Sequence, residues 1–272
     1  MVASAERLPV AAGHVPRLPF RLARAELLKL RRRRGLMITA ALLTIGATIV
    51  MIVAFELFHL SNSVKYGPAG GLDRFSRWVF ILSQLGSIAA VLVGASAGAD
   101  DLSAGVFREL VATGRSRTAL YLARIPAGLA VIWALLAGAF AIASVLSVGL
   151  AGSAPTPSAG LIVESGLWLG LTVALAFLLG LGVASLIGSR APTVAILFAW
   201  VLIVEPLLTH IDALGVGRDA LLSAADWKLA PGGLIGDKLR VSMPLGVSLG
   251  VITVWALVSL LVGLRRTQTR DA

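Results

Sequence analysis

The chain lacks cysteine altogether and has few charged residues, and both shortages limit what it can be. Without cysteine it forms no disulfide, no thiolate metal site and no cysteine nucleophile. Only 14% of its 272 residues are charged, whereas about a quarter are charged in an ordinary soluble domain. Its three histidines, His14, His59 and His210, are far apart and share no ligand spacing. We therefore expect neither a large soluble domain nor a metal site.

Apolar residues, by contrast, are abundant: they make up 57% of the chain, and its mean hydropathy is +0.90. A helix needs about 20 apolar residues to cross the roughly 30 Å hydrocarbon core of a bilayer. The sequence therefore predicts an all-α integral membrane protein, with an arm at residues 1–34 and a six-helix transmembrane domain at 35–272. The predicted spans are Gly35–Phe58, Trp78–Ala97, Pro126–Leu150, Leu161–Gly188, Pro192–Ile211 and Pro244–Leu264.

Lysine and arginine are unevenly divided between the two sides that six crossings define. Seventeen of the 24 lie in the N-terminal arm, between the second and third spans, at Arg190 and in the C-terminal tail; seven lie in the other loops. Because positive residues accumulate on the cytoplasmic side, we predict a cytoplasmic-membrane protein with both termini in the cytoplasm. Nucleic acid is not an expected partner despite the net charge of +10, because no aromatic residues alternate with the basic ones to stack bases.

The end of the arm has the periodicity of an amphipathic helix. At about 100° per residue, its apolar and basic side chains separate onto two sides, with Arg24 at the margin. We expect this N-terminal helix to lie in the headgroup plane with its apolar side toward the lipid; the simpler alternative is an arginine run that only orients the first span. The apolar side contains Phe20, Ala23, Leu27 and Leu30, and the basic side contains Arg21, Lys29 and Arg32.

A polar segment at residues 98–125 interrupts the apolar sequence between the second and third spans. It begins with Asp100 and Asp101 and contains a potential apolar anchor at helical spacing i, i+3, i+4. Charged residues flank the anchor and would set its orientation against a partner. The anchor consists of Phe107, Leu110 and Val111, and the flanking charges are Arg108, Glu109, Arg115 and Arg117.

With six spans, an amphipathic N-terminal helix and this segment, the chain resembles the ABC-2-type permease family. The local likeness consists of an acidic pair, then Gly105, a leucine-bearing helix and a turn before the third span, followed by Tyr121 and Arg124. Gly114 stands where proline is common, and aspartate replaces the usual glutamate. The resemblance implies that the segment is a coupling helix docking on a separate cytoplasmic ATP-binding cassette subunit. It also implies an exporter built from two permease copies, or one copy and a paralogue. The alternative is an amphipathic loop helix lying on the membrane.

The chain has no G-x-x-x-x-G-K-[ST] loop to bind ATP phosphates. We therefore expect no covalent chemistry and no bound cofactor in this chain, with ATP and Mg²⁺ held by the partner. Apolar spans rich in alanine, leucine, valine and glycine favour an amphipathic, lipid-like or drug-like substrate, and membrane lipids as neighbours.

Two alternatives to an exporter rest on polar residues within the predicted spans. Glu205, in the fifth span, is a candidate substrate or ion contact, since buried ionisable groups in membranes are often functional; it would suit a gradient-driven secondary transporter. Ser96 lies in a G-x-S-x-G pattern typical of hydrolases, with His210 as the possible base. We predict these two near opposite membrane faces, so Gly94 and Gly98 more simply favour close helix packing.

The extracytoplasmic loop, 209–243, is long enough to contain a short helix of its own. We predict this helix at Ala220–Leu229, with Trp227 and Lys228 as its anchors among the headgroups.

Overall fold

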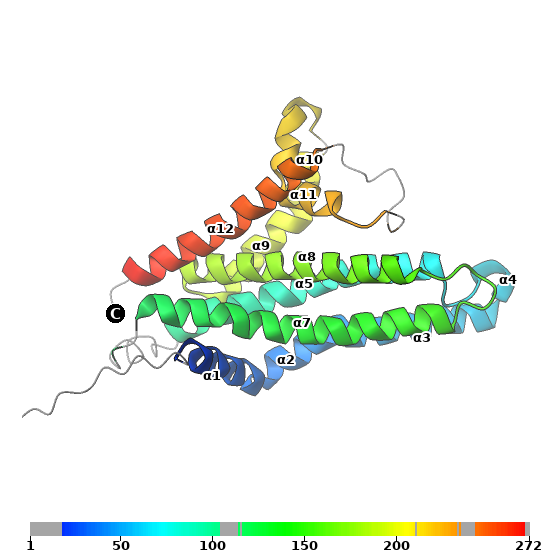
Figure 1. The fold of residues 1–272 in the computed structure, drawn as a ribbon, viewed down its shortest axis with the longest axis horizontal. Helices are drawn as coiled ribbons and strands as arrows, with labels where there is room; N and C mark the ends of the chain where they lie inside the picture. The colour runs from blue at the N-terminus through cyan, green and yellow to red at the C-terminus, as the bar shows by residue number, and fades with distance from the viewer. Residues whose placement is uncertain are drawn as a thin grey trace, which may run out of the picture.

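The computed structural model describes residues 18–103, 114, 116–209, 211–232, 234 and 243–269, and every regular element in them is helical. The described ranges contain helices and no strand (Figure 1). In order they are α1 (Leu18–Arg32), α2 (Arg34–Ala41), the π-helix η1 (Leu42–Gly46), α3 (Ala47–Ser61), α4 (Ser63–Tyr66), α5 (Leu72–Ser103), α7 (Arg117–Gly149), α8 (Ala159–Ile187), α9 (Arg190–Ala199), the π-helix η2 (Trp200–Val204), α10 (Glu205–Thr209), the 3-10 helix η3 (Asp212–Ala220), α11 (Leu222–Lys228) and α12 (Leu245–Thr269).

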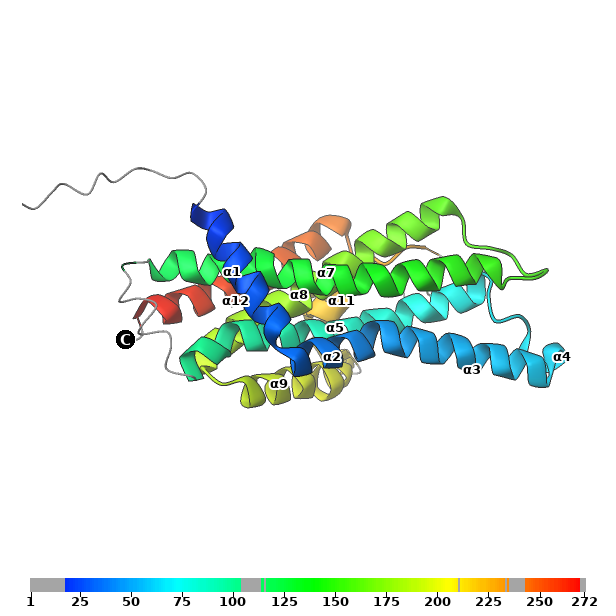
Figure 2. The same cartoon turned by 90° about the horizontal axis from the view of Figure 1, so that it is seen from below.

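Five of the helical segments are long and apolar enough to cross a membrane. They match the first, second, third, fourth and sixth segments predicted from the sequence, and α3, α5, α7 and α8 extend along the long axis of the molecule (Figures 1 and 2). Together they make the chain a multi-pass α-helical membrane protein. The five are Arg34–Ser61, Leu72–Asp101, Arg117–Gly149, Ala159–Ile187 and Leu245–Thr269.

The fifth predicted span is instead divided into three helical pieces. Its α-helical first part, α9, is too short to be counted with the five, and it continues through η2 into α10. The π-helical part ends directly before Glu205 and Pro206. A proline has no N–H for the carbonyl four residues before it, and such positions commonly depart from regular α-helix.

The bundle is held together by close contact between α5 and α8. A Cβ atom placed on Gly98 would lie 2.6 Å from the backbone oxygen of Leu181, and one on Gly180 would lie 2.8 Å from that of Val91. Only glycine permits backbones to approach this closely. The expected packing role of the small residues around Ser96 is therefore confirmed.

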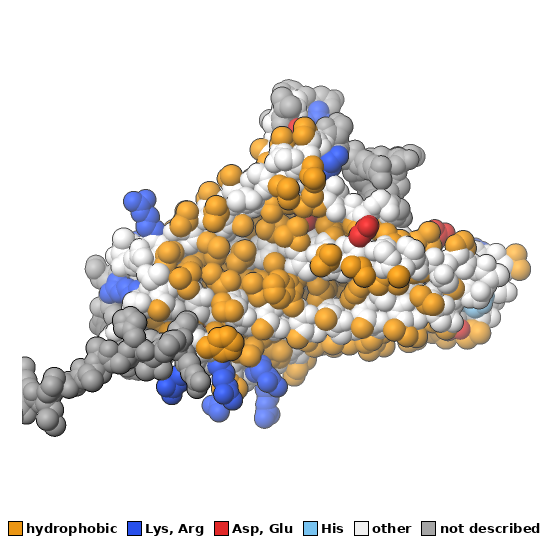
Figure 3. Space-filling view, viewed as in Figure 1, with side chains coloured by type: hydrophobic (Ala, Val, Ile, Leu, Met, Phe, Trp, Pro, Cys, Tyr) orange, Lys and Arg blue, Asp and Glu red, His pale blue; other side chains and the backbone are white. Residues whose placement is uncertain are grey.

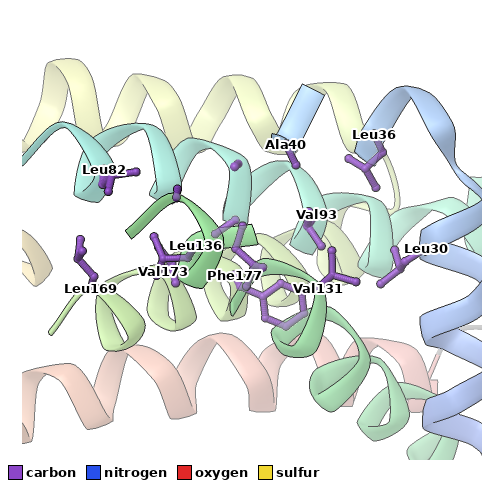
Figure 4. Close-up of a cluster of buried hydrophobic side chains, with 14 of the residues drawn as sticks. Leu30, Leu36, Ala40, Leu82, Val93, Val131, Leu136, Leu169, Val173 and Phe177 are labelled. Atoms are coloured by element: carbon purple, nitrogen blue, oxygen red, sulfur yellow. The ribbon is translucent and has the colours of Figure 1, made fainter. Parts of the chain in front are cut away.

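An apolar core forms where α5, α7 and α8 meet. Phe177 of α8 is fully buried and fits against Gly128 of α7, where any side chain would collide with its ring. Figure 4 shows Leu30 and Leu36 approaching the same cluster from the N-terminal helices. The first span and α12 are the least buried of the five, and apolar side chains cover much of the outer surface (Figure 3). An outward apolar surface of this kind suits contact with lipid.

Candidate functional site

The candidate site lies at the end of the bundle where the polar segment leaves α5 and enters α7. Helix α1 crosses the bundle there (Figure 2). Its inward side packs Leu22 against Leu120 and Ala123 of α7, and Leu30 is buried in the main core. These apolar contacts fix α1 against the bundle and bring its inward polar groups near the end of α5.

Three helices meet at the carboxylate of Asp101. Lys29 of α1 donates hydrogen bonds to both carboxylate oxygens, at 2.8 and 2.7 Å, and Arg124 Nη2 of α7 donates to Oδ2 at 2.9 Å. Glu26, one turn before Lys29, forms a further ion pair with it at 2.7 Å. We call Glu26, Lys29, Asp101 and Arg124 the charged junction. It connects α1, α5 and α7 at the start of the polar segment.

Arg124 is the most buried member of the junction, with an exposed fraction of 1%. Besides the carboxylate, its Nη1 reaches the backbone oxygen of Gly98 at 3.4 Å. A buried charge is tolerated when it is paired and hydrogen-bonded, and it becomes costly when its partner is removed. The buried Arg124 therefore requires the Asp101 carboxylate as its partner.

A second ion pair extends the junction along α1. Arg33, directly after α1, pairs with Asp100, the residue before Asp101. Consecutive aspartates of α5 thus bind the end of α1 at two points. The sequence assigns Asp100 and Asp101 to the polar segment and Lys29 to the N-terminal helix. The structure brings these residues of two separate segments together here.

The observed orientation of α1 differs from the expected one. Lys29 faces the bundle, whereas the sequence pattern groups it with Arg21 and Arg32 on the basic side; these two arginines and Arg24 are exposed. Phe20, expected on the lipid-facing apolar side with Leu27 and Leu30, is 84% exposed, while Leu30 is buried and Leu27 is half-buried. Contacts with other helices set this rotation: Leu22 and Leu30 pack into the bundle, and Lys29 binds the carboxylate of Asp101 on the same side.

Arg124 belongs to the local likeness described above, but the sequence assigns it no role in a site. It is a charged residue at the edge of an apolar helix, two positions before Pro126. Its own helix offers no explanation for the charge, because its partner lies in another helix, 23 residues earlier in the chain. A search for intramembrane charges that need a partner would have selected it.

Most of the expected coupling residues lie outside the described part of the chain. Two of the described ones are close to the start of α7: Gly114 lies three residues before this helix, and Arg117 is its first residue. Gly114 has a positive φ of 78°, a conformation that favours glycine over proline, whose φ is fixed near −65°. Arg117 donates to the backbone oxygen of Gln268 at 2.9 Å, linking α7 to the end of α12. Those outside are Gly105, Phe107, Arg108, Glu109, Leu110, Val111 and Arg115.

A second polar group occurs around α11. Glu205 of α10 is buried, and its Oε1 is 3.5 Å from the backbone nitrogen of Ser223. Asp226 of α11 is also buried and accepts a hydrogen bond from the Thr172 hydroxyl, with its two oxygens at 2.9 and 3.0 Å. The Trp168 indole N–H donates to the Asp226 backbone oxygen at 3.0 Å. These bonds fix α11 against α8.

Burial raises the pKa of Asp226 from 3.8 to about 7, the Thr172 hydrogen bond opposes the rise, and the charge of Glu205 adds to it. Helix α11 lies outside the five candidate spans. Asp226 is not among the residues that the sequence singles out, because the sequence pattern places this helix among the headgroups. A helix does form there, at Leu222–Lys228, but Trp227 is directed inward, with its ring 5.3 Å from that of Trp168 and 5.6 Å from that of Phe80.

The described residues show no Ser–His arrangement that would support the hydrolase alternative. Ser96 is buried and its hydroxyl has no hydrogen-bond partner among them, while His210 lies outside the described part of the chain. Within the described ranges, no three His, Asp or Glu side chains are grouped to hold a metal ion. Comparison of the chain with protein-family models and with curated protein sequences finds no match.

Proposed function

We propose that this chain is the membrane permease subunit of an ATP-driven exporter of the ABC-2 type, with ATP hydrolysed by a separate cytoplasmic subunit. The charged junction carries the proposal. It connects α1, the end of α5 and the start of α7 at the two points where the polar segment joins the bundle. A force applied to that segment by a partner would reach three helices at once.

The proposed mechanism uses this connection as a rigid joint. Nucleotide-driven closure of two ATPase subunits would move the polar segment, with Phe107, Leu110 and Val111 as its anchor. Because Asp101 is bound to both Lys29 and Arg124, α5 and α7 would tilt together with α1 rather than separately. Their concerted tilt would open a path between two copies of the permease, or between this chain and a paralogue.

The proposed topology has six crossings, with both termini in the cytoplasm and the charged junction at the cytoplasmic ends of the spans. The run from α9 through η2 to α10 spans residues 190–209, about 30 Å at 1.5 Å per residue, enough for the remaining crossing. The apolar surface of the bundle suits an amphipathic, lipid-like or drug-like substrate. In this proposal ATP is hydrolysed by the partner subunit, and the chain itself carries out no covalent chemistry.

Purification in mild detergent tests this function. The tagged full-length chain is isolated from its native host, co-purifying proteins are identified by mass spectrometry, and ATPase activity is measured. We expect a nucleotide-binding subunit whose activity depends on the permease. A chain that purifies alone, from a preparation that preserves other membrane complexes, would contradict the proposal.

A gradient-driven secondary transporter is the second candidate, and the neighbouring buried acids Glu205 and Asp226 favour it. Carboxylates that exchange protons are common in such carriers. The test is transport by the purified chain alone in proteoliposomes with an imposed pH gradient. Uptake without any ATPase, abolished by Asp226→Asn but retained by Asp73→Asn, an exposed aspartate of α5, would favour the carrier over the exporter.

A further inference from the structure

The outward side of α1 combines arginines with large apolar side chains. Phe20 is 84% exposed and Leu28 is 48% exposed, and four arginines are exposed beside them. They lie within one half of the helix circumference, at the spacing of three, four and seven residues that brings side chains to one face. We call Phe20, Arg21, Arg24, Leu28, Arg31 and Arg32 the arginine face. In Figure 3, basic side chains project from the part of the molecule where α1 lies in Figure 1.

The arginine face has no acidic residue of its own. Glu26 is the single acid in α1, and it is turned inward to pair with Lys29. The charged junction thus uses the acid and the lysine of α1 and leaves the four arginines without an intrahelical counter-charge. Their combined positive charge favours an anionic partner.

The position of α1 relative to the membrane indicates which anionic partner it meets. It contacts α7 at Leu120 and Ala123, within the first two turns of that candidate span, and α5 at Asp101, the last residue of another. The ends of spans lie at the level of the lipid headgroups. At that level an exposed phenyl ring and leucine reach the acyl chains, while guanidinium groups reach the phosphates above them.

We propose that the arginine face binds the headgroups of anionic phospholipids. Arginine suits this role because its planar guanidinium donates two parallel hydrogen bonds to a phosphate. Exposing Phe20 and Leu28 to water is unfavourable, and so is placing the arginines in hydrocarbon. The boundary between headgroups and acyl chains accommodates both kinds of side chain. The site would fix the orientation of α1 by lipid on its outer side as the charged junction does on its inner side. This inference requires no ATPase and stands independently of the proposed transport function.

The test uses the full-length chain in phosphatidylcholine vesicles with a trace of spin-labelled lipid. The quantity measured is the association of spin-labelled phosphatidylglycerol relative to spin-labelled phosphatidylcholine. We expect a several-fold preference for phosphatidylglycerol, reduced by 0.5 M NaCl because salt screens exposed charges. Arg21→Gln/Arg24→Gln/Arg32→Gln should lower the preference by about twofold or more; glutamine retains the helix propensity of arginine.

The matched control removes three exposed charges from the ends of two other helices, α9 and α12: Arg190→Gln/Arg265→Gln/Arg266→Gln. It should retain most of the preference. Equal loss in both triple variants would show a general charge effect and overturn the assignment to α1, as would an unchanged preference in the α1 variant. If the α1 variant instead loses a co-purifying protein while its lipid preference is unchanged, the face is a protein interface and the proposal fails.

Discussion

The Asp101 carboxylate and the Arg124 guanidinium, 23 residues apart in the chain, meet at 2.9 Å in the interior of the bundle. Arg124 is 1% exposed and Asp101 is 6% exposed. The pair joins two helices on either side of the polar segment, and Lys29 adds a third helix to the same carboxylate. This relationship gives the segment a mechanical connection to the N-terminal helix.

Removing the carboxylate should destabilise the fold severely. Asp101→Ala leaves Arg124 buried without its partner, which typically costs about 3–5 kcal/mol. Lys29→Met should cost much less, because Asp101 keeps the buried Arg124 as its partner and the ion pair that is lost involves a Lys29 side chain that is 32% exposed. Thermal unfolding in detergent measures both. Combining Asp101→Ala with Arg124→Met should recover part of the loss, whereas purely additive losses would contradict a direct pair.

The contact between α5 and α8 should not tolerate a methyl group at Gly98. Its Cβ would lie 2.6 Å from a backbone oxygen of α8, so Gly98→Ala is expected to cost about 1–3 kcal/mol through overpacking. Gly250 of α12 has no atom within 4 Å of the corresponding position. Gly250→Ala should therefore be neutral or slightly stabilising, because alanine has the higher helix propensity. Equal melting temperatures for the two variants would show that the close approach is absent.

Asp226 should make stability depend on pH. Its folded pKa of about 7 lies above the ordinary value of 3.8, so the folded state binds the proton more tightly. The unfolding free energy should then decrease as pH rises from about 4 to about 7, by roughly 1.4 kcal/mol per pH unit at most, and become level above that range. Asp226→Asn should remove this decrease, and Asp73→Asn, an exposed control, should not. Parallel curves for wild type and Asp226→Asn would refute the burial argument.

Variants in the polar segment test the coupling role directly. Phe107→Ala or Glu109→Arg should weaken capture of the ATPase by removing the anchor or reversing a flanking charge, while the protein still inserts and folds. Glu164→Arg provides the control, since Glu164 is an exposed glutamate near the start of α8. The measurement is the ratio of co-purified ATPase to permease. Full ATPase recovery and normal transport in the segment variants would mean that the coupling helix is wrongly assigned.

The charged junction shows what was predictable from the sequence and what was not. Asp100 and Asp101 stand out because two acids end an apolar helix, and Lys29 stands out within a basic amphipathic segment. The pairing of Lys29 with Asp101 does not follow, because the chain runs through two candidate spans between Lys29 and the end of α5. Arg124 and Asp226 share this property: each is explained by a partner on another helix.

By itself the sequence determined that this is a membrane protein, and it located five of its long helices, because apolar length is a local property that the bilayer thickness sets. It also determined the small residues that permit close packing. Only the tertiary structure decided which way α1 is rotated, that its lysine faces inward, and that Asp226 is buried. Rotation and burial depend on which side chains neighbouring helices present, and a buried charge takes the orientation in which a partner neutralises it.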